Sequence, residues 1–373
     1  MNKIKQKNDL GEFFEAKVAN YFFMKGYFVR RKISLKAYFY PKFLDVTDID
    51  VYGVYVGPDF SIKTIGIECK AGEFKKIDRI VWLLGLKKII NADQVYLATS
   101  KPVDIAIKSF AQIHGVSLLT NLKADDKTEL RHLPTDVSVL NTIMSFNNIF
   151  KNDNISYKLY WFLRSRYWFN DPYVNVIIIM ENFPDILRKL KESSNDTEKM
   201  ALRWLITEAT ILLSVALLKI ASQVHGIDKK YWKNYVISKL KYGKIDPSEA
   251  QKLLRLINEF IDAYLEQRGL KRDLREKIEL KAPKYAQDIV DVLDRLLTRP
   301  EESCEVPRIL DQILYHQLFR NKELNDYSKT LNRLLRSRNA DLDIALKLGK
   351  NVVNLFVKYL PGAIELFKEF LSL

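Results

Sequence analysis

The sequence predicts an α/β domain followed by an all-α domain. Over residues 1–125, helical and strand-like stretches alternate in the order α-β-β-β-α-β-α-β, which is typical of a sheet flanked by helices. Beyond about residue 155 nearly every segment has helical spacing of its apolar positions. The chain has 373 residues and 47% hydrophobic content, which is enough for two ordinary domains. We therefore expect domains at 1–125 and 156–373, joined by a polar and irregular segment at 126–155 that suits a linker or a helical bridge.

The first domain begins with a helix expected over residues 9–25. Phe14, Val18 and Phe22 recur at helical spacing, and Gly26 ends the run. The stretches that follow are rich in Val, Ile and Tyr and are bounded by glycine or proline turns, as strands are. Strands are expected near 27–35, 46–56, 62–69, 94–99 and 116–119, with helices at 77–91 and 103–114.

Two helices of the second domain are the best defined. Asp246 is expected to be an N-cap, with Pro247 at the first helical position and Glu249 two residues later. The stretch 197–224 is apolar on nearly all sides, which predicts the buried central helix of a bundle. Its longest apolar run, 211–220, is shorter than the ~20 residues that cross a membrane.

Composition indicates a soluble, cytoplasmic protein with a polyanionic partner. The formal charge is +14 and residues 1–125 contribute +7 of it, so the basic excess is densest in the first domain. The two cysteines, Cys69 and Cys304, are too few for a disulfide framework or a zinc cluster. The start of the chain has no apolar core of signal-peptide length, and no phosphate loop for ATP is present.

A group of charged residues in the first domain predicts a metal site. Asp50 is followed after seventeen residues by Glu68-Cys69-Lys70. In a hairpin, side chains alternate between faces, so Glu68 and Lys70 point the same way, Cys69 points the other way, and Asp50 can arrive beside them. Two carboxylates and an ammonium group at a strand end suit a hard divalent cation and a polarised water. This is the chemistry of phosphodiester hydrolysis.

A third acid, Glu15, lies on the first helix within Gly11-Glu12-Phe13-Phe14-Glu15. The pattern FE-x-x-V on a helix, Gly-Tyr, an Asp in a strand, Glu-x-Lys in the next strand and a closing Gly-Val-x-Leu-Leu strand resembles the PD-(D/E)XK, or restriction-endonuclease-like, superfamily. The most similar members are Mrr-type nucleases and archaeal Holliday-junction resolvases. The resemblance covers about residues 9–120 and implies a mixed central sheet flanked by helices. The proline that often precedes the Asp is Ile49 here.

The resemblance implies a role for each residue of the group. Asp50 and Glu68 would bind Mg²⁺, for which Mn²⁺ would substitute, with help from the backbone carbonyl of Cys69. Lys70 would position or help to deprotonate the attacking water and stabilise the charged transition state. Glu15 would be an accessory acid that acts through a metal-bound water.

Other interpretations of the same residues stay open. Asp50, Glu68 and Lys70 could form an ordinary charge cluster at a strand edge. Glu68 follows apolar residues, where an ionised acid is costly unless it is paired or metal-bound, and this favours a site. Asp48 and Glu12 are solvated acids or neighbours of the site.

Several basic residues of the first domain could contact phosphates, although each alone is more often part of a solvated surface. They are Arg30, Arg31, Lys32, Lys75, Lys76 and Arg79.

The predicted function is that of a Mg²⁺-dependent endonuclease, with DNA as the expected substrate. A ribonuclease of the same fold, or an inactive nucleic-acid or protein-binding module, are the alternatives. The helical domain would form a homodimer or select the substrate through apolar faces that include Trp204, Leu205, Leu212 and Leu213. On this view a 1–125 fragment, if soluble, would retain weak nicking activity.

Overall fold

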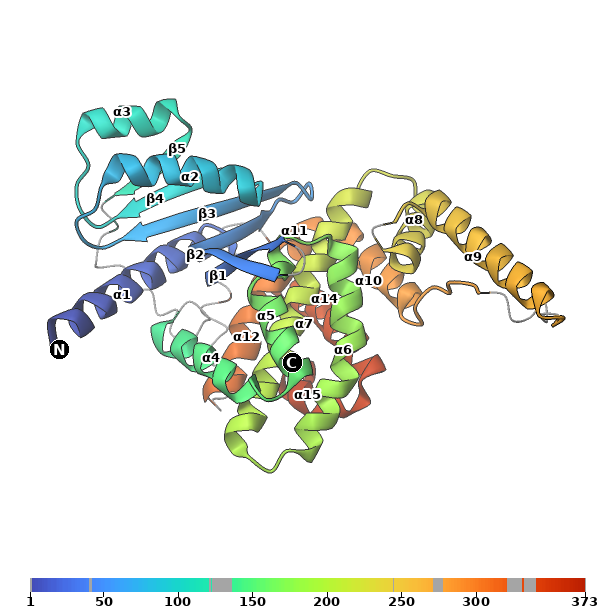
Figure 1. The fold of residues 1–373 in the computed structure, drawn as a ribbon. Coiled ribbons are helices and arrows are strands. Elements are labelled where there is room, and N and C mark those ends of the chain that lie inside the picture. The colour runs from blue at the N-terminus through green and yellow to red at the C-terminus, as the bar shows by residue number, and fades with distance from the viewer. Residues whose placement is uncertain are drawn as a thin grey trace.

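The computed structural model describes residues 2–39, 42–120, 122, 136–243, 245–270, 278–320, 331 and 340–372. It contains an N-terminal five-stranded mixed sheet with flanking helices and a helical C-terminal part (Figure 1). The first part comprises α1 (Asn2–Met24), β1 (Phe28–Phe39), β2 (Lys42–Val56), β3 (Ile62–Lys70), α2 (Lys76–Ile90), β4 (Gln94–Thr99), α3 (Ile105–Ile113) and β5 (Val116–Thr120). This order and the α/β class are those predicted from the sequence.

The strands lie in the order β1-β2-β3-β4-β5. β1, β2 and β3 are antiparallel neighbours, whereas β3, β4 and β5 are parallel. The change occurs at β3 because the β1–β2 and β2–β3 connections are short, while α2 and α3 provide the crossovers that parallel pairs require. α1 covers one face of the sheet, and α2 and α3 cover the other (Figure 1).

The helical part is the larger of the two. Its elements are α4 (Val137–Phe150), α5 (Asn154–Arg164), η1 (Arg166–Phe169), α6 (Pro172–Glu192), α7 (Asp196–Val224), α8 (Lys229–Tyr242), α9 (Pro247–Gln267), α10 (Ala286–Thr298), α11 (Pro300–Ser303), α12 (Val306–Arg320), α14 (Leu342–Tyr359), η4 (Pro361–Ala363) and α15 (Ile364–Ser372).

The central helix of this part is α7, as its all-round apolar sequence predicts. Among the described residues it is the one helix whose length and composition would suffice to cross a membrane, and 89% of its most apolar stretch is buried by neighbouring elements. This burial corrects one expectation. Trp204, Leu205, Leu212 and Leu213 all lie in the core, so they cannot form a dimer surface.

The N-cap of α9 is also confirmed, because the Asp246 side chain accepts a hydrogen bond from the Ser248 backbone N–H. α8 and α9 extend away from the rest of the bundle (Figure 1). Of the α9 side chains only Ala250 is buried, and the outer face, which includes Phe260 and Tyr264, is exposed.

The segment 126–155, expected to be a linker or a helical bridge, contains α4 at residues 137–150. Its apolar side chains Ile143, Phe146 and Phe150 are buried, and the helix contacts α5 and α7. Residues 123–135 lie outside the described part of the chain.

The sheet and the helices share one core. The Trp168 ring of η1 stacks on Phe28 with centroids 6.2 Å apart and meets Tyr52 edge-on at 5.4 Å. Arg30 of β1 is buried against Glu208 of α7 and Asp311 of α12. A 1–125 fragment would expose these side chains to water, which bears on the condition that it be soluble; its activity stays a prediction.

Candidate functional site

Asp50, Glu68 and Lys70 come together at one end of the sheet, as their spacing predicts. The β2–β3 ladder pairs Val51 with Ile67, so Asp50 and Glu68 lie one step beyond that pair, on adjacent strands and the same face. Lys70 Nζ lies 2.6 Å from Glu68 Oε1 and 4.0 Å from Asp50 Oδ2. The ammonium group therefore touches both carboxylates from their own face of the sheet.

Cys69 points away from this group, and its backbone serves the site instead. The thiol is buried, and burial raises the pKa of Cys69 well above its ordinary value. The Cys69 backbone N–H donates to Asp50 Oδ2 at 2.7 Å. In a strand, the N–H and C=O of one residue point to the same side, so the Cys69 carbonyl also faces β2 and Asp50.

The electrostatics of Asp50 are unusual for a surface acid. Burial and, next, the nearby charge of Glu68 raise the pKa of Asp50 to about 7, while the Cys69 N–H and Lys70 oppose the shift. Glu15 adds a smaller repulsion. Three acids thus act on one another, and the nearby Lys70 only partly offsets their negative charge.

Glu15 is near the site but is held by another partner. Its Oε2 accepts a hydrogen bond from Arg31 Nη2 at 3.0 Å. Arg31 pairs with Val51 in the β1–β2 ladder, so its side chain lies on the α1 face, opposite to Asp50 and Glu68. Glu15 therefore lies near the carboxylate pair but on the opposite face of the sheet, and it is not part of the pair.

Two residues expected to contact phosphates are buried, which corrects their assignment. Arg30 is 2% exposed and forms two-pronged ion pairs with Glu208 and Asp311, at 2.7 to 3.0 Å. Arg31 is fully buried and bound to Glu15. Neither guanidinium is accessible to a nucleic-acid strand, because both side chains are packed in the interior against acidic partners.

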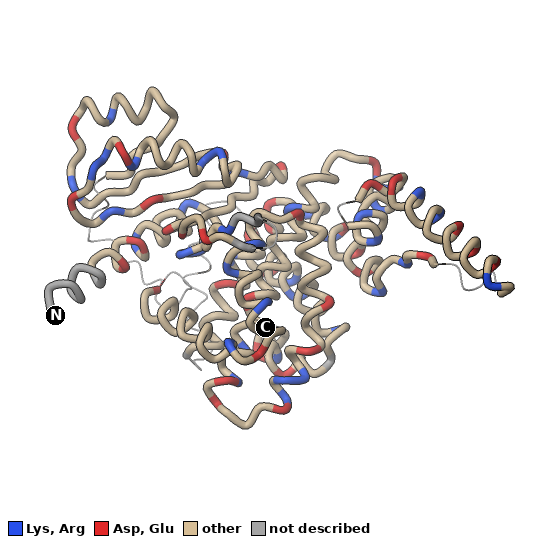
Figure 2. The backbone as a smooth tube through the Cα atoms, viewed as in Figure 1, with Lys and Arg blue, Asp and Glu red and all other residues tan. Residues whose placement is uncertain are grey.

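The other four basic residues keep part of their surface. Lys75 is exposed and Lys76 half-buried near the start of α2, and Arg79 Nη1 lies 3.6 Å from Glu68 Oε1. Lys32 Nζ is bound to Glu12 Oε1 at 2.8 Å. All four therefore keep surface that a ligand from solution can reach. Along the backbone, basic and acidic residues are interspersed in both parts of the molecule (Figure 2).

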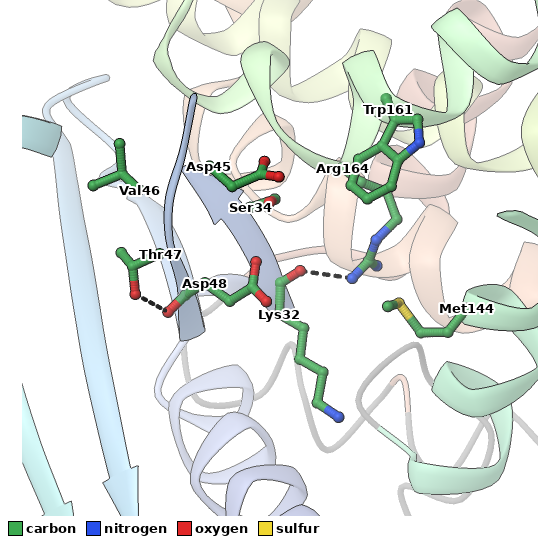
Figure 3. Close-up of a pocket in the computed structure, with 9 residues that line it drawn as sticks. All are labelled: Lys32, Ser34, Asp45, Val46, Thr47, Asp48, Met144, Trp161 and Arg164. Atoms are coloured by element: carbon green, nitrogen blue, oxygen red, sulfur yellow. Dashed lines mark hydrogen bonds between the residues drawn. The ribbon is translucent and has the colours of Figure 1, made fainter. Parts of the chain in front are cut away.

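A cavity of about 300 Å³, which we call the hairpin cavity, lies between β1–β2 and the helices α4 and α5 (Figure 3). Its lining residues are Lys32, Ser34, Asp45, Val46, Thr47, Asp48, Met144, Trp161 and Arg164. Asp48, whose function the sequence left open, is therefore a wall residue of this cavity. Its neighbour along the same strand face is Asp50.

The sequence did not reveal the contributions of the helical part. Arg164 and Trp161 reach the hairpin cavity from α5, more than a hundred residues after the strands they face, and no local pattern marks them. Glu208 carried a usable signal, because an acid within an all-round apolar helix requires a buried partner. Arg30 is that partner.

The oxygen ligands available at the site fit a divalent cation, although they are few. Asp50 and Glu68 supply carboxylate oxygens and Cys69 can supply a carbonyl, which are the hard ligands that Mg²⁺ prefers. In the described part of the chain no group of three or more His, Cys, Asp or Glu side chains is arranged around one ion position. Two acids with a carbonyl and water would complete the coordination, and a cation would relieve the repulsion that raises the pKa of Asp50.

No family model, curated protein or solved structure matches this chain.

Proposed function

We propose that the protein is a metal-dependent endonuclease of the restriction-endonuclease-like fold that hydrolyses phosphodiester bonds, with DNA as its substrate. The observation that supports this most strongly is the pair Asp50 and Glu68 on one sheet face, with Lys70 touching both. Two carboxylates held close together repel each other, and such a pair is more typical of a functional site than of a structural ion pair.

Each residue has a defined task in this proposal. Asp50 and Glu68 would hold the cation, and the Cys69 N–H would fix the orientation of Asp50 by its hydrogen bond to Oδ2. When bound, Mg²⁺ supplies an activated water and offsets negative charge on the phosphoryl oxygens. The Lys70 ammonium group would orient that water and would stabilise the additional negative charge of the transition state.

The surroundings of the pair support a large anionic substrate. Lys70 and Arg79 both retain exposed surface beside Glu68, so they can reach a phosphate that approaches from solvent. Lys75 and Lys76 lie near the start of the same helix as Arg79. The formal charge of +14 favours association with a polyanion over a small neutral substrate.

A cleavage panel tests the function. Full-length protein would be incubated with duplex, single-stranded, flapped and branched DNA and with RNA, in Mg²⁺, in Mn²⁺ and in excess EDTA. We expect cleavage of DNA that requires the metal. The matched control is Asp50→Asn, which retains the shape of the side chain and an oxygen for the Cys69 N–H.

The outcomes separate the alternatives. Metal-dependent cleavage of RNA alone would identify a ribonuclease. Binding without cleavage of any substrate, equal for the wild type and Asp50→Asn, would identify an inactive module and contradict the proposal.

A further inference from the structure

The hairpin cavity lies directly beside the carboxylate pair. In the β1–β2 ladder Arg31 pairs with Val51 and Ile33 with Ile49, so Lys32 lies level with Asp50. The next inward pair along the same face is Ser34 with Asp48, and both line the cavity. A strand whose phosphate lies at Asp50 could therefore place a neighbouring nucleotide at this cavity.

One wall of the cavity is formed by Arg164, a buried arginine that has no acidic partner among the described residues. Arg164 is only 6% exposed, and its Nη2 donates to the carbonyls of Arg31 and Lys32 at 3.2 and 2.7 Å. Among the described residues no carboxylate lies within 4.0 Å of it. A buried guanidinium requires compensating acceptors, and two carbonyls bound to one of its nitrogens leave capacity for further acceptors.

The opposite wall carries a carboxylate. Asp48 extends from β2, across the cavity from Arg164 (Figure 3). It is exposed, and within the described part of the chain it has no ion-pair partner. The remaining charges on the walls are matched, since Lys32 binds Glu12 and Asp45 binds Lys36 at 3.1 Å. The Arg164 guanidinium, a hydrogen-bond donor, and the Asp48 carboxylate, an acceptor, thus face each other across the cavity, and both can form further hydrogen bonds.

The rest of the lining is apolar or neutral. Trp161 and Met144 provide the apolar part, and Ser34 and Thr47 provide hydroxyl groups. The volume of about 300 Å³ is at the lower end of cavities that hold small organic ligands. An anion alone fits poorly, because Asp45 and Asp48 would repel it. A nucleobase has hydrogen-bond acceptors for Arg164, donors for Asp48 and an apolar surface for Trp161 and Met144.

We propose that the hairpin cavity receives one unpaired nucleobase of the substrate strand, next to the phosphate held at Asp50. The inference rests on the proposed nuclease function for the identity of the strand. It narrows the substrate class to nucleic acid with at least one unpaired nucleotide, because a base within a duplex cannot leave its stack without cost.

Binding in EDTA tests this without any cleavage. Three labelled DNA duplexes of one sequence would be compared by fluorescence anisotropy with the full-length protein: one fully paired, one with a single-nucleotide bulge, and one with an abasic residue at the bulge. We expect the bulged duplex to bind about tenfold more tightly than its abasic counterpart, as for one stacked and hydrogen-bonded base.

Two variants locate the effect. Ser34→Ile fills the cavity without a change of charge, and the ratio of bulged to abasic affinity should fall to about one. Asp48→Asn should lower the same ratio several-fold, and it retains the fold because Asp48 supports no described neighbour. Asp196→Asn, an equal change at an exposed position on α7, should leave the ratio unchanged.

The outcomes distinguish the two proposals. A ratio near one in the wild type, or a tenfold ratio that survives both Ser34→Ile and Asp48→Asn, would overturn the cavity assignment even if metal-dependent cleavage is found. Preference for the bulged duplex that is lost in these variants would support the assignment even if the protein fails to cleave.

Discussion

Two ionic clusters lie on neighbouring strands of the same sheet, and they differ in how their charges are balanced. In the first, Arg30 is enclosed by Glu208 and Asp311, and each carboxylate receives two hydrogen bonds. In the second, Asp50 faces Glu68, and the nearby Lys70 touches both. The first cluster joins the sheet to the helices. The second is partly open to solvent, where Lys70 and Arg79 keep exposed surface beside Glu68.

The pKa values express this difference. Burial raises the pKa of Asp311 to about 6, and Arg30 opposes that shift. Burial and the nearby charge of Glu68 together raise the pKa of Asp50 to about 7. The comparison indicates that the first cluster encloses one shared cation between its two acids in the core, whereas the second holds its two acids close together beside partly exposed Lys70.

The largest stability effect is expected at Arg30. Arg30→Met leaves Glu208 and Asp311 buried without their cation, which should lower the free energy of unfolding by about 3–5 kcal/mol. Asp50→Asn removes a like-charge repulsion and should raise that free energy by roughly 1 kcal/mol at pH 8 without metal. Urea unfolding of both variants measures the contrast. A stable Arg30→Met, or an equally destabilised Asp50→Asn, would show that the two clusters do not differ in this way.

The next effect concerns the rate of cleavage. Lys70→Ala removes a positioned charge worth about 2.7–4 kcal/mol in a transition state, which predicts a loss of about 10²–10³ in the rate constant. DNA affinity should change little, because one phosphate contact among several is lost. Single-turnover cleavage and filter binding separate the two quantities, and Lys76→Ala is the matched control. Full activity of Lys70→Ala would remove this lysine from the mechanism.

A pH effect on metal binding should follow from Asp50. Its raised pKa means that the metal-free protein holds a proton there below about pH 7, and a cation must displace that proton. Mn²⁺ affinity should therefore fall about tenfold per pH unit as the pH is lowered from 7. Calorimetric titrations at several pH values provide the measurement, and the dependence should vanish in Asp50→Asn. A flat profile in the wild type would contradict the assignment of Asp50 as a ligand.

The same shift affects stability, with a defined sign. A raised carboxyl pKa lets the folded state bind a proton that the unfolded chain releases near pH 4. The metal-free protein should therefore lose stability as the pH rises from about 4 to 7. Thermal melts with and without Mn²⁺ test this, and the metal should stabilise the protein more at pH 8 than at pH 6.

The smallest effect is expected at Arg79. Its guanidinium is 42% exposed and 3.6 Å from Glu68, so the ion pair should contribute less than about 1 kcal/mol to stability. Arg79→Gln should weaken DNA binding a few-fold and lower the slope of its salt dependence by about one phosphate contact. An unchanged slope would show that Arg79 does not contact the substrate.

The sequence was sufficient for the parts of the fold that depend on local patterns. The alternation of apolar residues located β2 and β3, and the period of two placed Asp50, Glu68 and Lys70 on one face with Cys69 opposite. The order of helices and strands along the chain followed from the same periodicities and from glycine and proline turns, whereas the order of the strands within the sheet was not predicted.

Contacts between distant segments could not be predicted in this way. Arg30, Arg31 and Lys32 form a basic run that is typical of a phosphate-binding surface, yet their burial depends on Glu208, Asp311 and Glu15. The apolar residues of α7 indicated a hydrophobic surface, but not that α5, α6 and α12 cover it. The hairpin cavity forms because α5 packs against β1. No residue in either segment indicates this contact.

The most direct test is the rate of Mg²⁺-dependent DNA cleavage by Glu68→Gln relative to the wild type. Both would be assayed on the best substrate of the panel at equal folded concentration, with Glu208→Gln as the matched change in the other cluster. We predict a loss of at least about 100-fold for Glu68→Gln, and a rate equal to that of the wild type for Glu208→Gln at the same folded concentration. Equal rates for Glu68→Gln and the wild type, or wild-type cleavage that persists in excess EDTA, would contradict the account.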